Sequence, residues 1–316
     1  MKKELYIGID TSNYTTSLAI LDGDGHLVAN LKRPLPVKEG ECGLRQSDAV
    51  FHHTVNVPSL MEEARAYLSD GEVMAIGVSE KPRNTEGSYM PCFLVGCSVA
   101  KSLSSFLSVP VYGFSHQCGH IMAALYSSEN TEIPDGSLAA FHVSGGTTEL
   151  VRVSPCNGGF LSELVGGTAD LNAGQVIDRI GVRMGLPFPA GRHLEELAKQ
   201  NTKRIPKKKI SRKDLSINLS GLENMADKLL LETEDKALVA AFVFDYIGRA
   251  LAELMEEYER INGACRFLFA GGVMCNSIVR SIVARHADCL FADPMLSADN
   301  AVGTAALAFR KHKTEK

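Results

Sequence analysis

The sequence predicts an α/β protein made of two related halves. A strand, a turn of small residues and a returning strand are expected at 5–21 and again at 138–153. Each hairpin is followed by further strand patterns and by amphipathic helical segments. A length of 316 residues also suits two domains. We therefore expect an internal duplication, although a chance likeness of two hairpins explains the pattern equally well.

The first half begins with two buried strands, at 5–10 and 15–21, because apolar residues dominate on both sides of a short polar turn. Amphipathic patterns predict helices at 57–68 and 93–107. A short apolar strand is then expected at 110–114, and it leads directly into another helical pattern.

Polar residues at 127–136 mark the expected boundary, which divides the chain into a first domain at 1–130 and a second at 131–316. The second half is predicted by the same patterns. Its expected strands are 138–143, 147–153 and 266–270, and its expected helices are 174–184, 222–231 and 236–260.

The composition is that of an ordinary globular protein, with 45% hydrophobic and 22% charged residues. A net charge of −4 argues against a protein that coats DNA. No convincing signal peptide is expected, and the longest apolar run, 237–244, is far too short to span a bilayer. Eight scattered cysteines fit neither a disulfide scaffold nor a cysteine-rich zinc module. These observations predict a reduced, cytoplasmic protein without membrane contact.

His116 and His120 stand four residues apart at the start of a predicted helix. This spacing stacks both imidazoles on one helix face, close enough to bind a single cation. Such a pair alone is weak evidence, because satisfied histidines are common in cores and on surfaces. Asp299, before an alanine-rich helix, is either a metal ligand or only a helix N-cap.

Turns of small residues at strand ends predict a nucleotide site. The turns at 144–148 and 11–13 have little bulk over their first backbone amides, so a phosphate can approach them. Glycines at 271–272 allow a ring to stack against the backbone, and the Asn276 amide can bond a ribose or a phosphate. One glycine pair usually marks only a turn. Several in one chain favour a nucleotide in a cleft between the halves.

Carboxylates complete the predicted site. Asp10 ends a strand, where it could hold a hydrated Mg²⁺ beside the phosphates, and with Ser12 it forms the expected catalytic pair. Asp178, on a predicted helix, is an expected partner of a ribose hydroxyl. The stretch 203–213 (KRIPKKKISRK) is strongly basic. Most such runs are solvated loops, and the alternative is a landing site for phosphates, such as those of RNA.

Together these residues resemble the universal threonylcarbamoyladenosine synthase family, the TsaD-type proteins long labelled M22 or O-sialoglycoprotein endopeptidases. The resemblance runs nearly from end to end. Its landmarks, in order, are Gly8-Ile9-Asp10-Thr11-Ser12, His116 with His120, Val143-Ser144-Gly145-Gly146, 173–178 (AGQVID), 186–191 (LPFPAG), 219–222 (LSGL), 271–276 (GGVMCN) and Asp299-Asn300.

The resemblance implies an actin/Hsp70/sugar-kinase fold with two ribonuclease-H-like lobes around a nucleotide cleft. It implies one divalent metal, iron or zinc, bound by His116, His120 and Asp299, with Mg²⁺ accompanying ATP or an adenylate. Family members transfer a threonylcarbamoyl group from its adenylate to N6 of adenosine 37 in tRNA. TsaB- and TsaE-like partner proteins or a homodimer are the implied assemblies. The implied contacts with the adenylate are His142, Val143, Ser144, Gly145, Gly146, Asp178, Gly191, Gly271, Gly272 and Asn276.

The chain departs from the family pattern at several positions. Residues 13–15 (NYT) stand where the typical synthase has a cysteine and two acidic residues. Asp170-Leu171 and Gln175 replace a double aspartate and a glutamate, and Glu223 replaces a lysine. The segment 80–91 is longer and more charged than the usual Gly-Pro-Gly turn. These changes predict a divergent paralogue.

Three functions follow from these features. The first is transfer of threonylcarbamoyl to tRNA. The second is a metal-dependent carbamoyl transferase with another acceptor, like the related domain of the hydrogenase-maturation carbamoyltransferase, with Lys81 and Arg83 recognising a different anion. The third is a weakly catalytic, nucleotide-binding paralogue that regulates a true synthase. Endopeptidase activity is rejected, because Gln117 and Cys118 stand where a zinc protease has its glutamate base.

Overall fold

The computed structural model describes residues 2–12, 14–36, 44–128, 138–156, 159–297 and 299–316. The chain forms two compact units. The first consists of Met1–Asp135, Val153–Glu163 and Met295–Lys316, and the second of Gly136–Arg152 and Leu164–Pro294.

The sequence predicted a single boundary at residue 130, which placed Asp299 in the second domain. The observed division differs from this prediction. The last residues of the chain instead belong to the first unit, because the C-terminal helix packs on its sheet. Most of the predicted boundary, 129–136, lies outside the described residues, as do Asn13 and Cys42.

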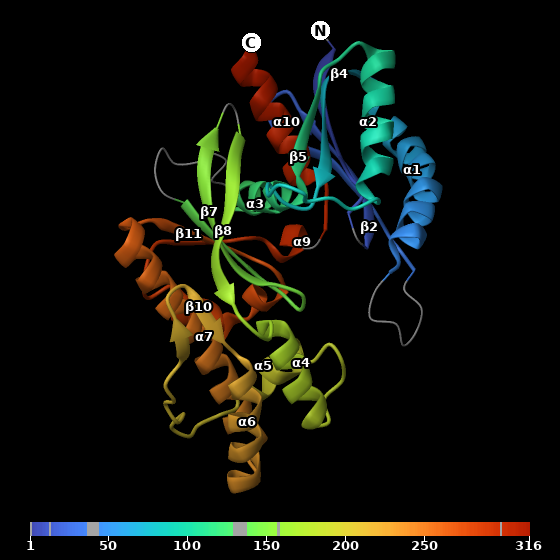
Figure 1. Ribbon diagram of the computed structural model, residues 1–316. Coiled ribbons are helices and arrows are strands. Elements are labelled where there is room, and N and C mark those ends of the chain that lie inside the picture. Colours follow the sequence, from blue (N-terminus) through green and yellow to red (C-terminus); the bar gives the residue numbers. More distant parts are fainter. Residues whose placement is uncertain (1, 13, 37–43, 129–137, 157–158, 298) are drawn as a thin grey trace. The chain divides into compact units, whose positions relative to one another are not determined.

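The first unit is built on a five-stranded sheet in the order β3-β2-β1-β4-β5 (Figure 1). The pairs β1–β2 and β2–β3 are antiparallel, whereas β1, β4 and β5 run parallel. The central strand β1 is buried from its third residue onward, as the apolar run in the sequence predicted. The strands are β1 (Lys3–Asp10), β2 (Thr15–Asp22), β3 (Leu27–Pro34), β4 (Gly71–Lys81) and β5 (Val111–Ser115).

Helices pack on both faces of this sheet (Figure 1). On one face lie α1 (Gln46–Leu68) and α2 (Phe93–Leu107), and on the other lie α3 (His116–Ser127) and α10 (Val302–Glu315), which follows the short α9 (Pro294–Ser297). The start of α10 comes so close to β1 that a Cβ on Gly8 would lie 2.4 Å from the Ala301 carbonyl oxygen. Only glycine therefore permits this contact.

Helix α1 begins at Gln46, well before the expected start at residue 57. Pro58 lies inside the helix, where it cannot donate a backbone hydrogen bond. The helix persists because one apolar stripe runs on both sides of the proline. Its buried residues are Ala49, His53, Val57, Leu60 and Ala64.

The second unit contains a seven-stranded sheet in the order β12-β11-β6-β7-β8-β10-β9. Reading β8-β7-β6-β11-β12 reproduces the order of the first sheet, and β6, β11 and β12 are parallel, like β1, β4 and β5. The expected duplication is therefore present in the strand order. The strands are β6 (Leu138–Val143), β7 (Thr148–Cys156), β8 (Gly159–Thr168), β9 (Ser211–Lys213), β10 (Ser216–Asn218), β11 (Arg266–Ala270) and β12 (Cys289–Phe291).

The core of the second unit is dominated by α7, in which Phe242, Phe244 and Tyr246 are each 1% exposed. The three helices predicted here from periodicity, α4, α6 and α7, end within two residues of the expected positions. Among the described residues, no helix has the length and apolarity needed to cross a bilayer. The helical elements are α4 (Ala173–Arg183), α5 (Gly191–Ala198), α6 (Ser220–Thr233), α7 (Lys236–Asn262), the 3₁₀ turn η1 (Gly272–Cys275) and α8 (Ser277–Val283).

Candidate metal centre and nucleotide pocket

His116 and His120 occupy successive turns at the start of α3. The helix begins directly after β5, and its N-cap Ser115 accepts a hydrogen bond from the Cys118 amide at 3.2 Å. The two imidazole centroids are 4.3 Å apart and the two Nε2 atoms 2.9 Å apart. The sequence spacing thus brings both rings to one point, as predicted.

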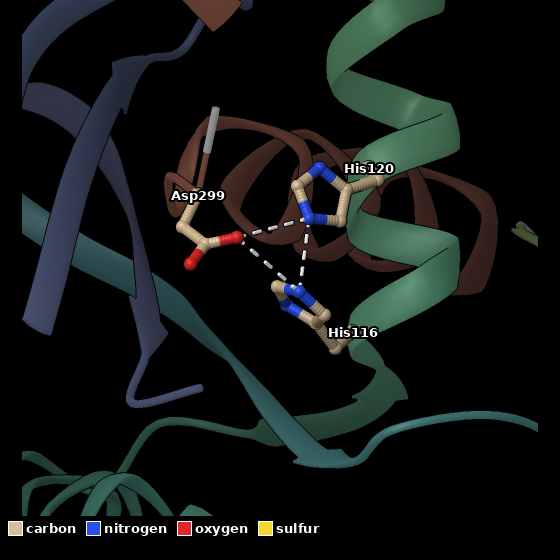
Figure 2. A group of neighbouring side chains, drawn as sticks. All are labelled: His116, His120 and Asp299. Atoms are coloured by element: carbon tan, nitrogen blue, oxygen red, sulfur yellow. Dashed lines mark hydrogen bonds and ion pairs between the residues drawn. The ribbon is translucent and has the colours of Figure 1, made fainter. Parts of the chain in front are cut away.

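Asp299 meets the two imidazoles within the first unit (Figure 2). Its Oδ1 atom lies 3.3 Å from His120 Nε2 and 3.6 Å from His116 Nε2. Asp299 is not the N-cap of the following helix, because α10 begins at Val302 and it is Asn300 Oδ1 that accepts from the Val302 amide. Asp299 thus lies beside the two histidines instead of capping α10.

Asp10 lies behind His116 and is 1% exposed. One carboxylate oxygen is 2.8 Å from His116 Nδ1 and accepts from Ser79 Oγ at 2.6 Å, and the other accepts from the Ser12 amide at 2.8 Å. Both oxygens are thus occupied inside the protein. This geometry makes Asp10 an anchor for His116, in place of the expected contact with hydrated Mg²⁺.

Electrostatics strengthens this anchor. Burial by itself raises the pKa of Asp10, but the charge and hydrogen bond of His116 outweigh it, and the pKa stays well below its usual range. Burial lowers the pKa of His116, and Asp10 more than reverses this, so the net shift is upward. Because an ionised carboxylate only accepts, Nδ1 of His116 carries a proton and donates it to Asp10.

The three residues fit a divalent metal. His116 Nε2, His120 Nε2 and a carboxylate oxygen of Asp299 lie within 4.8 Å of one another. Zinc-type bonds of about 2.0–2.2 Å require neighbouring ligand atoms roughly 3 Å apart. Because Nδ1 of His116 donates to Asp10, a bound cation would displace only the Nε2 proton, and Nε2 would then offer its lone pair to the metal. Two nitrogens and one carboxylate suit either iron or zinc.

Ser12, the other expected catalytic residue, is also 1% exposed. Its amide holds Asp10, and its buried Oγ has no hydrogen-bond partner among the described residues. Ser12 therefore lies in the wall that supports His116.

The second unit contains a cavity of about 600 Å³ with residues from several predicted motifs in its wall. The sequence-predicted residues in the wall are Gly145, Asp178, Gly191, Gly272 and Asn276. The wall does not include His142 and Val143, which end β6, Ser144 and Gly146, which lie in the turn after it, or Gly271, which follows β11. A larger hollow of about 740 Å³, beside β8 and β10, includes only Thr148 of the predicted turn at 144–148.

In the turn after β6, the side chain of Ser144 occupies backbone amides that a phosphate would need. Ser144 Oγ accepts from the amides of Gly146 and Thr147 at 3.2 and 3.1 Å, so a phosphate would compete with these bonds. Gly271 has a φ of 98°, and a Cβ there would lie 2.3 Å from the Val143 carbonyl oxygen. Backbone packing therefore requires glycine at position 271.

Asp178 and Asn276 present polar groups to the cavity. Asp178 Oδ1 accepts from the Ala190 amide at 2.8 Å, which fixes the carboxylate at the start of α5. Asn276 Oδ1 caps α8 by accepting from two amides, at 3.0 and 2.9 Å. Asn276 is 6% exposed, and its buried Nδ2 has no partner among the described residues. A ligand oxygen or ring nitrogen would satisfy this donor.

Sequence reasoning missed other parts of the wall. Glu195 is held there by Ser277, whose Oγ and amide both donate to Oε1, at 2.6 and 3.0 Å. Burial raises the pKa of Glu195, but Lys199 and Ser277 outweigh it and leave the pKa below its usual value. Arg192 and His193 also line the cavity. They directly follow Gly191 of the predicted motif, and this position in the sequence could have indicated them. The other missed residue is Phe244.

Comparison with known proteins identifies the relatives of this chain. Residues 39–306 match the family model TsaD, described as tRNA N6-adenosine threonylcarbamoyltransferase. A protein of that name from Streptococcus suis (strain 05ZYH33) is 31% identical over 326 residues, covering 98% of this chain and 92% of the relative. Another from Streptococcus pneumoniae (strain Hungary19A-6) is 32% identical over 299 residues, covering 90% and 84%.

Solved structures share the fold at low identity. Full-length HypF in its phosphate- and nucleotide-bound form has a TM-score of 0.60 at 11% identity, covering 99% of this chain and 46% of HypF. The ROK hexokinase from Thermus thermophilus has a TM-score of 0.52 at 15% identity, covering 98% and 99%. The predicted actin/Hsp70/sugar-kinase-like fold class is thereby confirmed. The chain belongs to the TsaD family of tRNA N6-adenosine threonylcarbamoyltransferases.

Proposed function

We propose that this protein transfers a threonylcarbamoyl group from its adenylate to N6 of adenosine 37 in tRNA, and that it uses one divalent metal held by His116, His120 and Asp299. The observation that carries the proposal is the convergence of these three side chains in a member of this family. The chain also matches its relatives over most of their length.

In this proposal the metal, when bound, acts as a Lewis acid that polarises the carbamoyl carbon toward a weakly nucleophilic amine. His116 and His120 supply neutral nitrogen ligands, and Asp299 supplies the charged one. Asp10 keeps the Nδ1 proton of His116 in place, so that Nε2 stays available as a ligand. Ser79 and the Ser12 amide hold Asp10 in turn.

The second unit would bind the adenosine part of the adenylate. Asn276 Nδ2 is a buried donor without a partner among the described residues, and the Asp178 carboxylate is fixed in the same wall, suited to a ribose hydroxyl. An acceptor on the ligand that pairs with Nδ2 would remove the cost of leaving that donor unsatisfied.

The unusual residues of the central motif have structural roles that support a working family member. Gln175 Oε1 accepts from the Asn172 amide at 3.1 Å and completes a capping box at the start of α4. Asp170 accepts from the Leu219 amide at 2.7 Å and the Ser220 amide at 3.1 Å, which fixes the start of α6. The substituted residues thus fix the starts of α4 and α6 in this chain.

Reconstitution tests the proposal. The purified chain, combined with TsaB- and TsaE-like partner proteins, Mg²⁺ with ATP, the threonylcarbamoyl adenylate and an unmodified tRNA transcript, should produce threonylcarbamoyladenosine, measured by mass spectrometry of digested nucleosides. His116→Ala is the matched inactive control. Absence of product in every combination, with and without partners, would overturn the proposal. Turnover of a carbamoyl adenylate without tRNA would instead indicate another acceptor.

A further inference from the structure

The basic stretch at 203–213 is fixed along helix α7 of the second unit. Three of its seven basic side chains form ion pairs with acidic residues at or on that helix. These pairs join Lys203 to Asp235 at 2.7 Å, Lys207 to Asp245 at 2.5 Å, and Arg212 to Glu257 at 3.4 Å and Glu253 at 3.7 Å. One set of cations therefore serves to anchor the segment.

The backbone of the segment is anchored as well. Arg249 on α7 donates to the Lys208 carbonyl at 3.0 Å, and the Tyr246 hydroxyl approaches the Lys209 carbonyl at 3.5 Å. Ile210 is 3% exposed and belongs to the core. An irregular segment held at this many points keeps its shape before any partner binds.

The remaining four basic residues are Arg204, Lys208, Lys209 and Lys213, which we call the basic strip. All four are exposed, and none forms an ion pair with a residue that the structure describes. The rest of the chain is acidic enough to give a net charge of −4. The basic strip is thus a local positive surface whose cations are not neutralised by the protein.

We propose that the basic strip binds the phosphate backbone of the RNA substrate. Unpaired Lys and Arg side chains on a preformed segment attract polyanions, and release of counterions supplies much of the free energy. A membrane surface is disfavoured because the two isoleucines of the segment face the core, so no apolar side chain accompanies the charges into a bilayer. The identity of the RNA as tRNA rests on the proposed function, whereas the location of the contact does not.

The test compares two double variants of equal charge change. Lys208→Glu/Lys209→Glu reverses two charges of the basic strip, and Lys101→Glu/Arg285→Glu reverses two exposed cations outside it. Binding of an unmodified tRNA transcript is measured by fluorescence anisotropy between 50 and 200 mM salt. The basic-strip variant should bind about tenfold or more weakly at the lowest salt, and the control variant should bind within about twofold of the native chain.

A neutral variant measures how many contacts are lost. In Lys208→Ala/Lys209→Ala the slope of log affinity against log salt should fall by about 1.4–1.8, the value for two phosphate contacts. Equal weakening in the control variant, or an unchanged slope in the neutral one, overturns the proposal. So does tighter binding of phosphatidylserine vesicles than of tRNA.

The outcomes separate this inference from the proposed reaction. If the native chain binds tRNA through the basic strip but yields no threonylcarbamoyladenosine, the proposed reaction is wrong and the proposed RNA contact is retained. If Lys208→Ala/Lys209→Ala modifies tRNA with unchanged KM, the RNA surface is wrong and the reaction stands. Circular dichroism and metal content of each variant establish that its fold is intact.

Discussion

The two candidate sites differ in the elements that form them and in how their polar groups are paired. In the first unit, charged and polar side chains from β1, β4, α3 and the segment before α10 converge within hydrogen-bond distance of one another. In the second unit, the cavity wall is made largely of turns and helix starts, and a donor such as Asn276 Nδ2 is left without a partner among the described residues. In the metal centre the charged groups pair with one another, and only the Ser12 hydroxyl in the supporting wall lacks a partner among the described residues, whereas the unpaired donor of the second site lies in the wall of a cavity.

This difference predicts how each site fails. Removing one member of the network leaves the other buried charges uncompensated, so the effect should be large and shared by all readouts. Removing one group of the cavity should weaken a ligand and leave the fold unchanged. The following variants sharpen or break this comparison.

The largest effect is expected for Asp299→Ala. This variant lacks the anionic ligand, so metal content should fall from about one per chain to near zero, and transfer should fall on the order of 1,000-fold. Metal is measured by mass spectrometry after anaerobic purification. Asp48→Ala is the matched control, because Asp48 is an exposed carboxylate in the first turn of α1, away from the two histidines. Metal loss in the control, or retention in Asp299→Ala, contradicts the site.

Asp10→Asn tests the anchor separately from the ligands. The amide keeps the size of the side chain but removes the charge that holds the His116 proton, so metal affinity should fall about 10–100-fold. Competition with a chelating dye measures this affinity. Ser79→Ala, which removes only one hydrogen bond to Asp10, should have a smaller effect. Equal effects of the two variants would show that the charge of Asp10 is unimportant.

Asn276→Asp tests the cavity. The carboxylate can still cap α8, but the donor Nδ2 is gone, so unfolding should be unchanged while nucleotide affinity falls about 5–30-fold. Isothermal titration with ADP and thermal unfolding provide the two readouts. If the variant loses stability and nucleotide affinity together, the cavity fails in the same way as the metal centre, and the proposed difference between the two sites is wrong.

The smallest effect at neutral pH concerns His53, a buried histidine of α1 outside both sites. Its Nδ1 lies 2.8 Å from Thr16 Oγ1, and burial lowers its pKa to about 4 even though Asp10 and Asp299 act in the opposite direction. The unfolded state therefore binds a proton near pH 6.5 that the folded state accepts only near pH 4.

Stability should consequently fall as the pH drops from about 6.5 to about 4, by up to about 3 kcal/mol, and change no further below that through this group. His53→Leu should lose this part of the pH dependence. Urea unfolding at pH 7, 5.5 and 4 measures it. If the free energy of unfolding changes with pH equally in the native chain and in His53→Leu, His53 is not the source of the pH dependence.

Much of the fold could be predicted from the sequence because its periodic signals are strong. Helix α2 has the predicted bounds, and β6 and β11 were placed to the residue. The start of α1 was missed because Pro58 suggests a helix beginning, whereas the buried stripe from Ala49 to Ala64 decides it.

The site was partly predictable for the same reason. The spacing of His116 and His120 fixes their relation locally, and the family pattern adds Asp299. The anchoring role of Asp10 depends on β4 lying beside β1, which no local pattern encodes. Phe244 lies in an apolar run of α7, where nothing in the sequence distinguishes a residue of the cavity wall from one of the core.

The position of helix α10 has a consequence for folding. Since Met295–Lys316 complete the unit that begins with β1, the carboxylate of Asp299 and the cover over Gly8 both come from a segment that is distant in sequence. Closing such a long loop costs chain entropy before its contacts form. A metal bound by all three side chains would therefore stabilise the docked form of this segment.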